Sequence, residues 1–103
     1  FMTTNARIKK LIDDNEVLLF MKGNPTFPQC GFSSVACQAL GALDTSFETV
    51  DVLQDPEIRE GIKAYSSWPT IPQLYIRGEF IGGADIIREL YESGELAKTI
   101  SKE

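Results

Sequence analysis

Apolar residues recur with helical spacing in some segments of the chain and with strand spacing in others. Over residues 5–15, Ile8, Leu11 and Ile12 share one helical face, which predicts an amphipathic helix. Residues 17–23 ("VLLFMKG") then form a continuous apolar run of strand length that closes on glycine. Such a run is typical of a strand buried on both faces, so we expect it at the centre of a sheet.

The middle of the chain repeats this alternation of helix and strand. The apolar positions of residues 33–43 predict a second helix, with Cys30 in the loop or first turn at its N-terminus. Residues 46–52 ("SFETVDV") alternate as a strand does. The pair Asp55-Pro56 predicts the start of a third helix, because aspartate caps one free N–H group and proline removes another.

The last third of the chain predicts a hairpin followed by a helix. Residues 73–76 and 79–81 have strand character and are separated by a two-residue turn that contains glycine. Asp85 is positioned to cap a final helix, and Gly94 to stop it.

The expected order is therefore α-β-α-β-α-β-β-α, with no internal repeat and no linker. A strand-helix-strand unit requires a parallel pair with a right-handed crossover, and a hairpin requires antiparallel neighbours. The sequence thus predicts an α/β fold, a four-stranded mixed sheet flanked by helices, in a single domain spanning residues 1–103.

Charge and composition exclude several classes of function. The net charge is −5 and the ten basic residues are scattered, which argues against nucleic-acid binding. The longest apolar run is far shorter than the roughly 20 residues of a membrane span, and no signal segment opens the chain. We expect a soluble, cytoplasmic protein that contacts no membrane, with Met2 as its natural start.

Cysteine is the residue type left to supply reactive chemistry. The chain has no histidine, which removes Ser-His-Asp and Cys-His catalysis and imidazole metal sites. It has two cysteines, Cys30 and Cys37, too few for a four-thiolate metal site. Any such site needs ligands from elsewhere.

Cys30 stands where a helix N-terminus and a nearby cation, Lys22, favour a thiolate, so we expect a lowered pKa. The alternative is a small buried apolar side chain, against which the flanking proline and glycine argue. Ser33 occupies the place of the second cysteine in a Cys-x-x-Cys motif, so a mixed disulfide at Cys30 has no internal thiol to resolve it. Ser33 serves equally well as a helix cap. Cys37 lies too far along the helix for a disulfide, and we expect it to pack in the core.

Three blocks of sequence resemble one family. They are "MKGNPTFPQCGFS" (21–33), "WPTIPQLYIRGEFIGGADI" (68–86) and "SGEL" (93–96). In order and spacing they are similar to the monothiol glutaredoxins of the CGFS class in single-domain form. The resemblance covers nearly the whole chain and implies a thioredoxin-like fold.

The resemblance also implies a function. In that family the cysteine matching Cys30 ligates a bridging 2Fe-2S cluster, with one thiolate from each of two protomers and two from glutathione. We therefore expect a monomer without the cluster, a homodimer with it, and a role in iron-sulfur cluster transfer or assembly and iron homeostasis. The implied partners are a BolA-like protein and iron-sulfur recipient proteins.

The family positions that bind glutathione match five residues here: Lys22, Arg59, Ile71, Ala84 and Asp85. The two cations suit the glycyl carboxylate, the Ile71 backbone the cysteinyl part, and the Ala84-Asp85 segment the γ-glutamyl end. Without the resemblance, Lys22 and Arg59 are better interpreted as solvated surface charges. The resemblance further implies a cis peptide bond at Pro72.

Two other functions remain open from the sequence. One is a glutathione-dependent thiol-disulfide oxidoreductase that deglutathionylates proteins through Cys30 as catalytic residue. The other is an interaction module with a regulatory cysteine. The loop "GNPTFPQ" (23–29), longer than in dithiol glutaredoxins, accompanies cluster binding and weak reductase activity in the family that the chain resembles.

Overall fold

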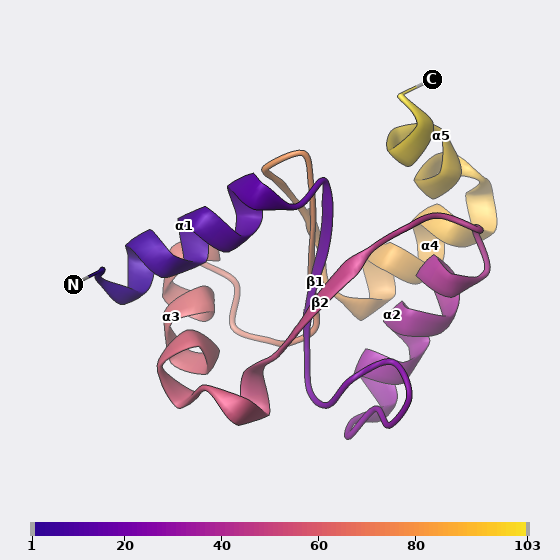
Figure 1. Ribbon diagram of the computed structural model, residues 1–103. Coiled ribbons are helices and arrows are strands. Elements are labelled where there is room, and N and C mark those ends of the chain that lie inside the picture. The colour runs from indigo at the N-terminus through magenta and orange to yellow at the C-terminus, as the bar shows by residue number, and fades with distance from the viewer. Residues whose placement is uncertain (1, 103) are drawn as a thin grey trace.

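The computed structural model describes residues 2–102 and places a four-stranded sheet between two layers of helices (Figure 1). The elements in chain order are α1 (Thr4–Asp14), β1 (Val17–Met21), α2 (Gly31–Gly41), β2 (Glu48–Asp51), the 3-10 turn η1 (Val52–Gln54), α3 (Pro56–Ser66), β3 (Gln73–Ile76), β4 (Glu79–Gly82), α4 (Ala84–Ser93) and α5 (Glu95–Ser101).

The sheet has the strand order β2-β1-β3-β4, with β1 and β2 parallel and the other neighbours antiparallel. The parallel pair is connected through α2, and β3 and β4 form the expected hairpin. Arg77 and Gly78 make its turn, both with positive φ (48° and 83°), as a two-residue hairpin turn requires. The predicted mixed sheet is confirmed.

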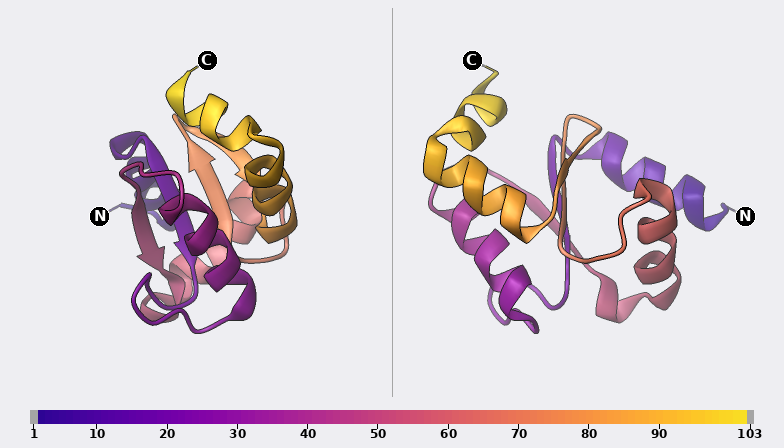
Figure 2. Two further views of the ribbon diagram at one scale, coloured as in Figure 1. Left: turned by 90° about the vertical axis from the view of Figure 1, so that its right-hand side faces the viewer. Right: turned by 180° about the vertical axis from the view of Figure 1, so that it is seen from behind.

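Helices cover both faces of the sheet, as Figures 1 and 2 show: α1 and α3 lie on one face, and α2, α4 and α5 on the other. Every residue of β1 is buried. Leu18 and Phe20 pack with α1 and α3, and Leu19 and Met21 with the opposite layer. This two-sided burial explains why β1 is a continuous apolar run. None of the helices in residues 2–102 is long and apolar enough to cross a membrane.

Two features differ from the sequence prediction. Gly94 ends α4 in a left-handed conformation (φ 84°), but α5 begins at once after it and buries Leu96 against the sheet layer. Asp85 does not cap α4: the cap position belongs to Gly83, and Asp85 is exposed in the first turn of the helix. Glycine has no side-chain oxygen that would mark a cap in the sequence, so the prediction that Asp85 caps α4 is wrong.

Asp55 joins the two helices of one layer. Its carboxylate caps α3 by accepting from the Ile58 N–H (3.2 Å) and also pairs with the Arg7 guanidinium of α1. The bond from Arg7 and the cap bond hold the pKa of Asp55 below its usual range. The carboxylate therefore contributes stability above its unfolded pKa, about 3.9. That contribution is lost as pH falls through the lower folded value.

We expect Asp55→Asn, which keeps the cap but removes the charge, to lower the urea midpoint at pH 7. The difference from wild type should shrink at a pH below the folded pKa, where the wild-type carboxyl is also neutral. Asp13→Asn, in an exposed pair with Lys9, is the control and should change the midpoint little. A pH-independent loss in Asp55→Asn would contradict this assignment.

Candidate functional site

Cys30 is the residue that caps α2, and it is partly exposed. The helix begins two residues earlier than its apolar pattern suggested, so the sulfur stands beside the first free N–H groups. The backbone N–H of Ser33 holds the pKa of the Cys30 thiol below its ordinary value. The Phe32 N–H and the charge of Lys22 act in the same direction, and burial opposes them. Cys30 therefore ionises to a thiolate more readily than an ordinary cysteine does.

The loop before Cys30 is tied to the sheet by backbone bonds. Gly23 donates to the Asp51 carboxylate at the end of β2 (2.9 Å), and Gln29 donates to the Lys22 carbonyl (2.9 Å). Asn24 Oδ1 accepts from the backbone within the loop, at 2.9 and 3.0 Å. The position of Cys30 thus follows from the ends of β1 and β2.

Ser33 is fully buried, and its Oγ accepts from the Lys22 N–H at 3.0 Å. It is not the cap of α2, since Cys30 holds that position. The hydroxyl instead joins the end of β1 to the first turn of α2. With serine at this position, the motif lacks a second thiol, and the Lys22 N–H has a hydrogen-bond acceptor.

Cys37 packs in the core as expected, 8% exposed, with its sulfur 3.2 Å from Met21 Sδ. Burial raises the pKa of the Cys37 thiol, whereas that of Cys30 is lowered. The two cysteines therefore differ in both access and ionisation.

At pH 7 we expect iodoacetamide to modify Cys30 selectively, because alkylation requires an accessible thiolate. The rate should rise with pH around a midpoint below that of a free cysteine. Mass spectrometry of the intact protein would show one adduct per chain after alkylation of the folded protein and two after alkylation in denaturant.

Cys30→Ser is the control: its remaining cysteine, Cys37, should stay unmodified until the protein unfolds. Equal alkylation rates for the two cysteines in the folded protein would refute this ordering.

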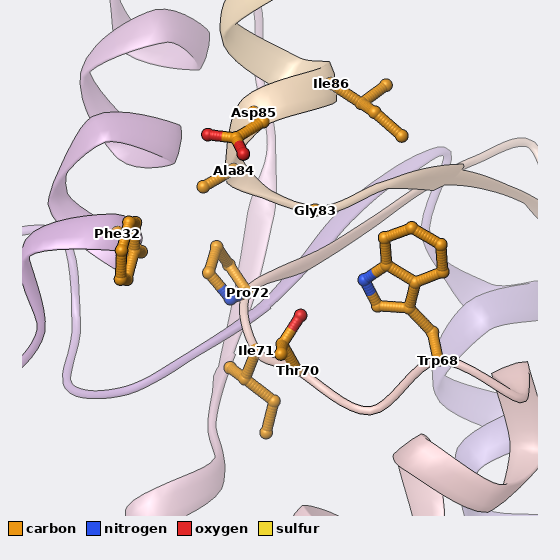
Figure 3. A pocket seen from close by; sticks show the side chains of 9 residues that line it. All are labelled: Phe32, Trp68, Thr70, Ile71, Pro72, Gly83, Ala84, Asp85 and Ile86. Carbon is orange, nitrogen blue, oxygen red and sulfur yellow. The ribbon is translucent and has the colours of Figure 1, made fainter.

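Two adjoining pockets form one groove beside Cys30. The first, about 380 Å³, is lined by Phe32, Trp68, Thr70, Ile71, Pro72, Gly83, Ala84, Asp85 and Ile86 (Figure 3). The second, about 340 Å³, is lined by Lys22, Cys30, Phe32, Lys63, Pro69, Thr70 and Ile71. They share Phe32, Thr70 and Ile71, so one molecule can span both, with the thiol at one end and α4 at the other.

The groove brings together four of the five residues expected to bind glutathione. Lys22 and Ile71 lie near the thiol, and Ala84 and Asp85 lie at the N-terminus of α4. Arg59 is not among the lining residues of either pocket. It lies one helical turn before Lys63 on α3, with its Nε buried and without a partner. The peptide bond between Ile71 and Pro72 is cis, as expected.

A family model described as Glutaredoxin matches residues 17–81, which include Cys30 and the strands β1 and β3. A Synechocystis protein named "Uncharacterized monothiol glutaredoxin ycf64-like" is 57% identical over 97 residues, 94% of this chain and 91% of that protein. The chain belongs to the monothiol glutaredoxins. "Monothiol glutaredoxin-S7, chloroplastic" of rice is 55% identical over 94% of this chain, which spans 58% of the rice protein.

The solution structure of reduced poplar apo GrxS14 shares the fold of this glutaredoxin. It is 51% identical with a TM-score of 0.80, over 93% of this chain and 88% of that one. The fold is thus thioredoxin-like.

Two residues of the groove of this glutaredoxin were not found from the sequence. Lys63 adds a cation beside Cys30 and also pairs with Glu60 (3.1 Å). Its spacing of four from Arg59 was the available signal. Gln73 is fully buried, and its Nε2 donates to the carbonyls of Trp68 and Thr70 (3.2 Å each). That amide holds the groove wall in place, and no sequence pattern separates it from a surface glutamine.

The charges of the groove suit an anionic peptide that carries a thiol. Lys22 and Lys63 place positive charge near Cys30 in a chain of net charge −5. The N-terminus of α4 offers N–H groups at the other end, beside the Asp85 carboxylate. Within residues 2–102 no three His, Cys, Asp or Glu side chains gather as a metal site.

Proposed function

We propose that this glutaredoxin carries a 2Fe-2S cluster as cargo, between two copies of the chain, and passes it to recipient proteins. Cys30 of each copy supplies one thiolate, and two glutathione molecules in the grooves supply the others, which together make the four that such a cluster requires. A BolA-like protein is a proposed partner.

The observation that carries this proposal is the isolation of one accessible thiol with a lowered pKa. Cys30 is partly exposed with a lowered pKa, while Cys37 is buried and Ser33 takes the second position of the motif. A thiolate with no neighbouring thiol forms no internal disulfide and stays available as a soft metal ligand. This thiolate is suited to be one of the four ligands that the cluster requires.

Glutathione fits the groove by charge. Its glycyl carboxylate suits Lys22, with Lys63 close by, and its cysteinyl backbone suits Ile71 in front of the cis proline. Its γ-glutamyl end suits the N-terminus of α4 and the Asp85 carboxylate, which attracts the ammonium group. The chain's own task is to hold the glutathione sulfur next to that of Cys30.

Cluster transfer requires ligands that can be exchanged. Two of the four proposed thiolates belong to a small molecule that dissociates, so a recipient's thiolates can replace them one at a time. The partial exposure of Cys30 leaves its sulfur within reach of that exchange.

A second function is favoured by the same lowered pKa. The Cys30 thiolate can attack a glutathionylated protein, which releases the protein thiolate and leaves a mixed disulfide between Cys30 and glutathione. A second glutathione thiolate then attacks this disulfide, frees Cys30 and forms oxidised glutathione. The reductant is the second glutathione and Cys30 is regenerated as a thiolate, so no second cysteine is needed.

The test is anaerobic reconstitution of the reduced protein with iron, sulfide and glutathione, followed by visible absorption and solution mass. We expect thiolate-to-iron bands together with a dimer. Cys30→Ser should lose both, and Cys37→Ser, the matched control, should keep both. Omitting glutathione should also abolish both.

A colourless monomer that reduces glutathionylated substrates at ordinary glutaredoxin rates would overturn the carrier proposal. The thiol would then be the nucleophile of an oxidoreductase.

A further inference from the structure

A buried N–H group without an acceptor stands in the wall of the groove. Among the described side chains, Trp68 Nε1 and Arg59 Nε are the buried polar atoms that lack a hydrogen-bond partner. Buried donors are nearly always paired in folded proteins, since an unpaired one destabilises the fold. A tryptophan in a core usually satisfies its N–H as well. The unpaired Trp68 N–H therefore indicates a missing hydrogen-bond acceptor, which a bound ligand can supply.

The indole is held beside the N-terminus of α4. Figure 3 shows its nitrogen-bearing edge turned toward the pocket, with Gly83 and Ala84 opposite. A Cβ on Gly83 would lie 3.2 Å from Nε1, a tight contact, so glycine leaves the nitrogen more room on that side than any other residue. Phe80 packs against the ring (centroids 5.6 Å apart, planes at 56°).

The N-terminus of α4, next to the indole, favours the same kind of group, a hydrogen-bond acceptor. Gly83 caps α4 without a side-chain bond, so the first N–H groups of this ten-residue helix lack a side-chain partner there. A carboxylate has two oxygens and fits both features: one oxygen at the helix N-terminus and the other at the indole N–H. An ammonium group has no acceptor for either.

We infer that Trp68 donates its indole N–H to the α-carboxylate of the γ-glutamyl residue of bound glutathione, and so helps to select that end of the ligand. The inference rests on the glutathione binding proposed above and adds a specificity-determining residue to it. Nε1 is covered without ligand, so this bond requires the indole edge to shift farther into the groove. The exposed segment of Pro69 and Thr70 that follows Trp68 can accommodate that shift.

The chain has a single tryptophan, so its indole N–H signal in a ¹H–¹⁵N spectrum is unambiguous. Reduced glutathione should move this signal downfield and slow its exchange with water. The analogue 4-aminobutanoyl-Cys-Gly, which lacks only the α-carboxylate of the glutamyl residue, should do neither.

Affinities measured by calorimetry distinguish loss of the hydrogen bond from Trp68 to the carboxylate from a general disturbance of the groove. Trp68→Phe keeps an aromatic ring and should weaken glutathione binding roughly tenfold or more, as a bond to a charged group does. It should leave the affinity for the analogue unchanged. Tyr91→Phe, which removes a hydroxyl on α4 outside the pocket lining, is the control and should bind both ligands as wild type does.

If glutathione binds the wild type but the indole signal stays fixed, the inference is wrong and the proposed function stands. An equal loss for both ligands in Trp68→Phe has the same meaning, since the ring would then act only by packing. If glutathione does not bind the wild type at all, the proposed function and this inference both fail.

Discussion

Gly23→Ala is expected to cost about 3 kcal/mol or more of the free energy of unfolding. Gly23 has φ 85°, a left-handed conformation in which a side chain is strained. Its Cβ would also lie 2.5 Å from the Phe27 carbonyl oxygen and 2.7 Å from the Gln29 nitrogen. Both obstacles are backbone atoms, so a side-chain rotation cannot relieve the overlap. Urea unfolding would measure the loss.

Gly78→Ala separates the two causes. Gly78 has nearly the same φ, 83°, but a Cβ there meets nothing within 4 Å. It should cost about 1 kcal/mol, the strain alone. Equal losses at the two glycines would mean that the crowded loop relaxes freely. Because this loop leads directly to Cys30, Gly23→Ala should also slow alkylation of the thiol.

Phe20→Ala is expected to destabilise the protein by about 3–5 kcal/mol, as large-to-small changes of buried aromatics do. Phe20 is fully buried in β1, and its ring meets Tyr75 edge to face (centroids 5.7 Å apart). The loss combines the transfer of the ring to water with the cavity that it leaves. Thermal unfolding should show it as a fall in Tm of roughly 12–40 °C.

Phe27→Ala is the matched control, since Phe27 is 69% exposed and should change stability by no more than about 0.5 kcal/mol. If Phe20→Ala does not fold, Phe20→Leu gives a smaller loss that is still measurable. A neutral Phe20→Leu and a destabilising Phe27→Ala together would reverse the assignment of core and surface.

The periodic segments were predictable because burial on one side or both sides leaves a direct trace in the sequence. The run in β1 is confirmed for that reason, and the Asp55-Pro56 start of α3 is confirmed because capping depends on adjacent residues alone. The helix α5 was missed because it is seven residues long and follows a glycine that does end α4. Nothing local distinguishes a glycine between two helices from one that ends the last helix.

The groove was predictable only in part. The position of Cys30 follows from its motif and from the helix after it. The buried amide of Gln73 and the unpaired indole N–H of Trp68 depend on contacts between distant segments, which leave no periodic signal. Asp85 shows the opposite error, because a residue type that favours caps sits one place inside a helix capped by glycine.

The groove is assembled from four separate stretches of chain: the end of β1, the start of α2, the last turn of α3 with the segment before β3, and the start of α4. None of them forms a binding surface alone, so any partly unfolded form that separates these stretches loses the site. A molecule that binds there is therefore coupled to the unfolding equilibrium of the whole chain. At one hundred times its dissociation constant it would add about 2.7 kcal/mol to the free energy of global unfolding, and so to every element that opens only when the whole chain unfolds.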